Sequence, residues 1–194
     1  MPPARIAPLA EPYSEEVVDG LARWMPPGAA VEPLLLFRTI LVNPRLSDAM
    51  RTLGSHILGR RYSLSLRERE LLIDRTCARC GAEYEWGVHA SAFGAAAGLT
   101  PEEVDATLDP SGMRAWPRRD ALLIRAVDAL HGAGRIPDEL WAELAAEWSP
   151  PQLLDIVATV GYYHLISFVC NATELPLEAW AARFPAPQPA GWTW

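Results

Sequence analysis

Apolar residues in this chain fall in a series of stretches, separated by Pro, Gly or a polar start led by Ser or Thr. The stretches that are typical of helices cover about 14–25, 33–42, 44–59, 66–80, 82–97, 117–132, 138–147, 150–173 and 176–184. Val, Ile and Thr do not alternate with polar residues, as they would in a half-buried strand. The pattern therefore predicts an all-α fold, a helical bundle.

The ends of two central helices are marked by capping residues. Ser65 and Glu68 have the spacing of a capping box, in which each side chain binds a free backbone amide at the start of a helix. Gly98 is expected to follow the end of the next helix, because glycine adopts the left-handed backbone at low cost. The helices over 66–80 and 82–97 are therefore expected to pack as a consecutive pair.

The segment 150–173 is apolar nearly all round its expected helix. A helix without a polar face lies at the centre of a domain or at a subunit interface. The chain also has 8 Trp residues, which agrees with a shared interface. We therefore expect a homo-oligomer that uses part of 150–173. No apolar run is expected to reach the roughly 18 residues of a membrane span.

Length and charge narrow the class of protein. The 194 residues suit one domain, which we place at 14–184, with an N-terminal arm over 1–13 and a Pro-rich tail over 185–194. The net charge of −7 argues against nucleic acid or an anionic membrane as the main partner. All 17 basic residues are arginines, which excludes Schiff-base chemistry and a P-loop lysine. Without a secretory signal at the start, we expect a cytoplasmic protein.

A candidate proton-transfer site lies in the central pair of helices. Glu85 and His89 are four residues apart and so share one helix face, where a carboxylate can orient an imidazole. An ordinary surface pair is the alternative, but the neighbouring residues are mostly apolar. If the two helices are antiparallel, Glu70 should reach His89 directly or through one water. Glu70 could instead pair with Arg67 or Arg75 on a solvated face.

Cys77 and Cys80 form a Cys-x-x-Cys candidate redox pair. Redox pairs of this kind usually lie at a helix N-terminus, where the helix dipole stabilises the thiolate. Here the pair falls near the expected C-terminal end of a helix, so we expect poorly reactive thiols that act as small buried residues. One Cys-x-x-Cys and one His leave a fourth zinc ligand unidentified, and we expect neither a metal nor a cofactor.

Three further residues are candidates for lining a substrate pocket: Tyr84, Trp86 and His164. His164 could equally be a core histidine whose hydrogen bonds are satisfied. His131 is expected to end a helix, where an imidazolium interacts favourably with the dipole. The sequence gives both histidines a structural role by default.

These motifs make the family recognisable. The segments 67–71, 83–89, 96–100 and 102–104 resemble the carboxymuconolactone decarboxylase family, which includes the alkylhydroperoxidase D-like proteins. The resemblance implies an all-α homo-oligomer, as a trimer, hexamer or dimer. In the peroxidase branch a Glu lies nineteen residues before a His, as Glu70 and His89 do. The redox cysteines of that branch would fall on Ala82 and Glu85, so the pair is missing from its usual place.

The resemblance and the residues together imply an enzyme rather than a scaffold. The favoured function is cofactor-free acid–base chemistry, a decarboxylation (lyase) or isomerisation, on a small organic acid, lactone or carbonyl compound. His89 would transfer the proton, and Glu85 would orient the imidazole. Glu70 would be a second carboxylate that tunes the imidazole or relays the proton. One alternative is a thiol peroxidase or disulfide reductase that uses Cys77 and Cys80. The other is a non-catalytic oligomeric binding protein.

Overall fold

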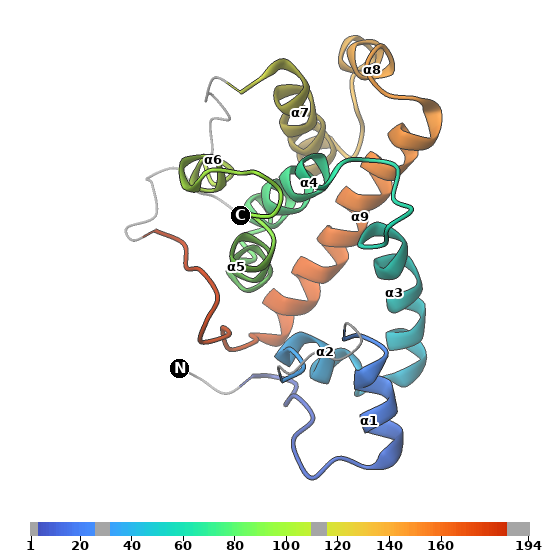
Figure 1. Ribbon diagram of the computed structural model, residues 1–194, viewed down its shortest axis with the longest axis vertical. Helices are drawn as coiled ribbons and strands as arrows, with labels where there is room; N and C mark the ends of the chain where they lie inside the picture. Colours follow the sequence, from blue (N-terminus) through green and yellow to red (C-terminus); the bar gives the residue numbers. More distant parts are fainter. Residues whose placement is uncertain (1–3, 26–31, 110–115, 186–194) are drawn as a thin grey trace.

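A computed structural model describes residues 4–25, 32–109 and 116–185. Regular secondary structure in this part of the chain is helical throughout, which confirms the all-α fold (Figure 1). The helices are α1 (Glu15–Ala22), α2 (Leu35–Ile40), α3 (Pro44–Ile57), α4 (Leu66–Arg79), α5 (Glu83–Ala92), α6 (Pro101–Ala106), α7 (Arg118–Ala133), α8 (Asp138–Ala145) and α9 (Pro150–Thr173).

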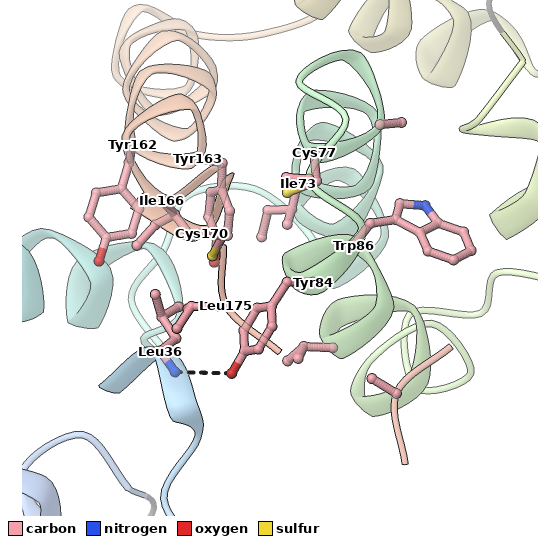
Figure 2. Close-up of a cluster of buried hydrophobic side chains, with 14 of the residues drawn as sticks. Leu36, Ile73, Cys77, Tyr84, Trp86, Tyr162, Tyr163, Ile166, Cys170 and Leu175 are labelled. Carbon is pink, nitrogen blue, oxygen red and sulfur yellow. Dashed lines mark hydrogen bonds between the residues drawn. The ribbon is translucent and has the colours of Figure 1, made fainter. Parts of the chain in front are cut away.

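Two helices organise the bundle. α9 runs through the middle of the molecule, with α4, α5 and α7 on one side and α3 on the other (Figure 1). α4 in turn packs against α5, α7 and α9. Figure 2 shows that the core between α4 and α9 includes the sulfurs of Cys77 and Cys170. The predicted pairing of the two central helices is confirmed.

The capping residues position this pair as predicted. The Ser65 side chain accepts from the Glu68 amide, and Glu68 accepts from the Ser65 amide, which completes the capping box of α4. Gly98 has the expected left-handed backbone, with a φ of 69°, but it does not directly follow the helix as predicted. The second helix is shorter than predicted, however, because it ends at Ala92 and turns cover the residues up to Gly98.

The prediction of a helix over 176–184 is wrong. Residues 174–185 form turns and extended chain instead, and they fold back over α5. The Ala182 amide is bonded to both the Gly87 carbonyl oxygen and Ser91 Oγ. A Cβ at Gly87 would collide with the Ala182 carbonyl oxygen, so only glycine allows this close approach. The backbone groups of this segment are satisfied by α5 rather than by a helix of their own.

α9 differs from the expectation about membrane spans. Its 24 residues are long and apolar enough to cross a membrane, by length and composition alone. Core helices of soluble proteins pass the same test, and half of the most apolar window is buried against the other helices. The prediction that no segment reaches this length is therefore wrong, while the expected central position of the helix is confirmed (Figure 1).

The N-terminal residues that were expected to form an arm have no helix between residues 4 and 13. They are tied to the bundle all the same, because the Arg5 amide donates to the Thr173 carbonyl and the Leu9 amide to the Arg38 carbonyl. Of the predicted tail over 185–194, all but Pro185 lies outside the described residues.

Candidate functional site

The contact between α4 and α5 joins the two residues that sequence spacing had paired. His89 Nδ1 lies 2.7 Å from Glu70 Oε2, and both side chains are buried. Glu70 is at the start of α4 and His89 is in the second half of α5, as an antiparallel pair requires. The prediction that Glu70 reaches His89 is confirmed.

The second ring nitrogen of His89 also has buried partners. His89 Nε2 lies 3.2 Å from the hydroxyl of Tyr163, on α9, and 3.5 Å from Glu85 Oε1. A protonated imidazole donates from both nitrogens, so Glu70, Tyr163 and Glu85 can all accept from it. The imidazole is thus held between two carboxylates, as the sequence suggested for Glu85 and Glu70.

These partners determine the charge of His89. Burial lowers the pKa of an imidazole, but the charge of Glu70 and the hydrogen bonds that His89 donates to Glu70 and Glu85 outweigh burial and raise the pKa of His89 to about 10. Burial likewise raises the pKa of Glu70, but His89 and Arg69 outweigh it, so the Glu70 pKa is lowered. At neutral pH the pair is an imidazolium and a carboxylate. His89 is therefore a proton donor in the resting protein.

Asp74 is a member of this site that sequence reasoning missed. It lies one turn after Glu70 on α4 and is 0% exposed, and neither carboxyl oxygen has a hydrogen-bond partner in the described part of the chain. Burial raises the pKa of Asp74 well above its usual value, and the charges of Glu70 and Glu85 add to the effect. Asp74 is therefore a neutral acid beside the charged pair. The i,i+4 spacing from Glu70 was the available signal.

Arg69 was also missed. Its Nε donates to Glu70 Oε1 at 2.8 Å, and its guanidinium lies over the Phe93 ring, 5.7 Å from the centroid. Among the described residues, the bond to Glu70 is the only side-chain hydrogen bond of Arg69, so the terminal guanidinium nitrogens can donate to another group. The ring of Phe93 also lies 5.1 Å from that of His89, which places Arg69 at the edge of the site.

Two further arginines of α4, Arg75 and Arg79, lie close to Asp128. Arg75 is 1% exposed and binds both carboxyl oxygens of Asp128 at 2.9 Å. Arg79 lies 3.6 Å from Asp128 as well. Arg75 also donates to the carbonyl oxygens of Thr107 and Asp109, so it holds the bundle together.

The thiols have the environment of structural cysteines. Cys77 is 0% exposed, and burial raises its pKa well above the usual value, with the charge of Glu85 adding to the effect. Cys80 is half-buried and its pKa is raised to about 11, again mainly by burial. Cys77, Cys80 and Cys170 are all free thiols. Neither member of the Cys-x-x-Cys pair is a ready thiolate at neutral pH.

We accordingly predict slow alkylation of both thiols of the pair at about pH 6, well below the ordinary thiol pKa. Cys80 should react before Cys77, because Cys80 is the more exposed of the two. Alkylation of the intact protein, followed by mass spectrometry of its peptides, measures both rates. Rapid stoichiometric modification of Cys77 at this pH would favour a thiol-based function instead.

The three candidate pocket residues have other contacts. The Tyr84 hydroxyl donates to Glu178 at 2.6 Å and accepts from the Leu36 amide at 3.0 Å (Figure 2). Trp86 Nε1 donates to Thr107 Oγ1, and the Trp86 ring packs in the core. Tyr84 and Trp86 therefore hold core segments together rather than face His89 with their polar atoms. His164 contacts His131, with 3.0 Å between ring nitrogens.

Residues 44–129 match the model of the carboxymuconolactone decarboxylase family. This segment belongs to that family. The resemblance drawn from the sequence motifs is thereby confirmed, and the match includes Glu70, Asp74, Glu85 and His89. A search of curated proteins finds no match.

Solved structures of the same fold confirm the architecture. An uncharacterized peroxidase-related protein from Silicibacter sp. TM1040 superposes with a TM-score of 0.77 at 15% identity, covering 95% of this chain and 99% of that one. The debrominase Bmp8, solved as a cysteine-to-alanine variant with 2,3,4-tribromopyrrole, gives a TM-score of 0.67 at 17% identity over 90% and 91% of the chains. A putative antioxidant defence protein from Agrobacterium tumefaciens gives 0.65 at 15% identity over 72% and 95%. At these identities the likeness shows the fold.

Proposed function

We propose that this member of the carboxymuconolactone decarboxylase family is a cofactor-free acid–base enzyme that acts on a small organic acid, lactone or carbonyl compound. One observation carries the proposal: a buried His89 is held between Glu70 and Glu85, whose carboxylates favour its protonated form. A general acid held in a site with little water can protonate a developing carbanion or enolate. The family resemblance supports the same class of reaction.

In a decarboxylation, the bond between the carboxylate carbon and the α-carbon breaks and CO₂ leaves. The electron pair passes into an adjacent carbonyl or double bond, and His89 then delivers its proton to the carbon. Glu70, 2.7 Å from Nδ1, keeps the ring oriented and stabilises its positive charge before transfer. After the transfer, His89 is neutral and must regain a proton before the next turnover.

In an isomerisation, the site needs a base as well as an acid. Glu85 Oε2 is buried and has no hydrogen-bond partner within the described residues. It can accept a proton from one carbon while His89 delivers a proton to another, so the double bond moves without change in composition. Both reactions use His89 as the acid, and the substrate decides between them.

Arg69 is the residue we assign to the carboxylate of a substrate. A guanidinium binds a carboxylate through two parallel hydrogen bonds, and the terminal nitrogens of Arg69 are the donors at the edge of the site. The position of the Arg69 guanidinium over the Phe93 ring helps to hold it at the edge of the site. This arrangement favours small acids over neutral substrates.

Proton exchange in heavy water tests the proposed chemistry. The protein is incubated in D₂O with a panel of unsaturated lactones, β-keto acids and β,γ-unsaturated acids, and products are followed by NMR. We expect deuterium at the carbon that loses CO₂ or receives the shifted proton. Consumption of organic hydroperoxide that depends on Cys77 or Cys80, with no carbon deuteration, would establish the thiol peroxidase alternative. Binding without any turnover would establish the binding-protein alternative.

The role of Arg69 gives a kinetic prediction. Arg69→Gln should raise KM for an acidic substrate by about 10-fold or more, because a charge-assisted hydrogen bond is worth about 1.5–3 kcal/mol. The effect on kcat should be smaller. Arg125→Gln is the control, since Arg125 forms an exposed pair with Glu143. Equal KM values for Arg69→Gln and the unaltered protein would contradict the assignment.

We also propose that the protein is cytoplasmic and forms a homo-oligomer through α9. Four exposed apolar residues share one face of that helix: Leu154, Val157, Leu165 and Phe168. We call this face the α9 stripe. Contiguous exposed apolar surface marks interaction sites, and the family resemblance implies an oligomer.

Phe168→Glu should therefore dissociate the oligomer, because a charge buried without a partner in an apolar interface is costly. Light scattering at micromolar concentration measures the mass. Val18→Glu is the control, since Val18 is 50% exposed and lies on α1. A monomeric unaltered protein, or an oligomer of Phe168→Glu with unchanged mass, would overturn this proposal.

A further inference from the structure

Three helices bring a thiol and two imidazoles together away from Glu70 and Glu85. Cys80 follows the end of α4, His131 is in the last turn of α7 and His164 is in the middle of α9. Cys80 Sγ lies 3.9 Å from His131 Nδ1, which lies 3.0 Å from His164 Nε2. The three ligand atoms are all within 4.8 Å of one another.

The orientation of His164 is fixed by a second hydrogen bond. His164 Nδ1 lies 2.8 Å from the Val160 carbonyl oxygen, which can only accept, so Nδ1 carries the proton. The lone pair of a neutral His164 is then on Nε2, the atom that faces His131 and Cys80. Metal-binding histidines are usually held by such a bond from the other ring nitrogen.

We propose that Cys80, His131 and His164 form a zinc site. Thiolate sulfur and imidazole nitrogen are the ligands that Zn²⁺ prefers in proteins, and three protein ligands leave the fourth tetrahedral position for water or a small ligand. All three residues are half-buried, so an ion and a water molecule can reach them. The site shares no residue with the acid–base site.

The distances agree with tetrahedral coordination after small movements. With bonds of about 2.1 Å to nitrogen and 2.3 Å to sulfur, two nitrogens lie about 3.4 Å apart and sulfur and nitrogen about 3.6 Å apart. The observed 3.0 Å and 3.9 Å differ from these values by a few tenths of an ångström.

The surrounding charges permit a cation here. The guanidinium groups of Arg75 and Arg79 lie near the cluster, but Asp128 pairs with both of them. The Cys80 carbonyl accepts from Asn171 Nδ2 at 2.8 Å, which holds this end of α4 in place.

Binding must release one proton, from the Cys80 thiol. A metal binds the thiolate form of cysteine, so it has to displace that proton, and affinity should increase with pH. His131 changes tautomer, so that its Nδ1 lone pair faces the ion and its Nε2 carries the proton. His164 already has the required tautomer when neutral.

Cobalt provides the direct test, because Co²⁺ replaces Zn²⁺ and its bond to a thiolate gives a charge-transfer band. The full chain is reduced, stripped of metal with a chelator and titrated with Co²⁺, and then with Zn²⁺. We expect one equivalent to bind, with a sulfur-to-cobalt band that Zn²⁺ removes. No band at a protein concentration of tens of micromolar would overturn the proposal.

Variants assign the ligands. Cys80→Ser should remove the band, and His131→Gln should lower Zn²⁺ affinity by about 100-fold, as loss of a ligand costs at least as much as loss of a residue that orients one. Cys77→Ala and His56→Gln are matched controls that should keep both band and affinity. An unchanged band in Cys80→Ser, or unchanged affinity in His131→Gln, would refute the site. If Cys80→Ser does not fold, His131→Gln decides alone, because metal binding is measured without any substrate.

Discussion

Replacing His89 with Gln should reduce turnover in the proposed acid–base reaction by about 10²–10⁴-fold, the usual contribution of a general acid. Glutamine keeps a hydrogen-bond donor near Glu70 but has no proton to transfer. The helices should remain assembled at 25 °C, since the core around α4 and α9 is unaffected. Melting should occur at a lower temperature, because Glu70 and Glu85 lose their shared cation.

His56→Gln is a matched control for this substitution. His56 Nε2 also pairs with a carboxylate, 2.8 Å from Asp155 Oδ1, but on the exposed surface. Its replacement should leave turnover unchanged. Product formation in D₂O, with circular dichroism to verify the fold, gives the comparison. If His89→Gln retains full activity, the proton comes from elsewhere and Asp74 becomes the first candidate.

The fold was predictable because local signals and burial point to the same answer. Ser65 with Glu68 marks the start of a helix through backbone hydrogen bonds that depend only on neighbouring residues. The failure at 176–184 has the opposite cause. That segment is held by Gly87 and Ser91 of α5, which are about ninety residues away in the chain.

The site was predictable only in part. The spacing of Glu70, Glu85 and His89 places them on facing helices, so their contact follows from the pairing of α4 and α5. Asp74 was missed because burial of α4 cannot be read from its sequence. That helix is rich in charged residues, yet most of it is buried, since the bundle surrounds it on several sides.

The charges of α4 are compensated by residues from other helices. Arg75 is paired with Asp128 of α7, and Glu68 with Arg119 of the same helix. When each helix is considered by itself, its charged side chains are expected to face solvent. For the same reason His131 and His164 were assigned structural roles, because their shared contact with Cys80 depends on how three helices pack.

Replacing Glu70 with Gln should change the charge of His89 more than any other substitution in the site. Glu70 is the closest carboxylate to the ring, at 2.7 Å, and its charge is the largest contribution that raises the His89 pKa. Without it, burial dominates, and the His89 pKa should fall from about 10 toward or below its usual 6.5. NMR titration of protein labelled in its histidine rings measures this shift without a substrate.

Two variants separate the contributions of the neighbouring carboxyls. Glu85→Gln should lower the His89 pKa by less, since Glu85 is 3.5 Å from the ring. Asp74→Asn should change it least, because the raised pKa of Asp74 keeps that carboxyl neutral at pH 7. A His89 pKa that falls as far in Asp74→Asn as in Glu70→Gln would mean that Asp74 carries the charge.

Glu70→Gln should also alter how the free energy of unfolding depends on pH. In the unaltered protein, protonated His89 contributes stability that is complete below about pH 6.5, its unfolded pKa, and is lost as pH rises through about 10. In Glu70→Gln this contribution should be missing at every pH above about 6.5, and breaking the buried pair should cost about 3–5 kcal/mol. Urea unfolding at several pH values measures both effects. A Glu70→Gln variant whose stability still falls between pH 8 and 10 as in the unaltered protein would show that Glu70 does not hold the imidazolium, and the proposed acid would lose its physical basis.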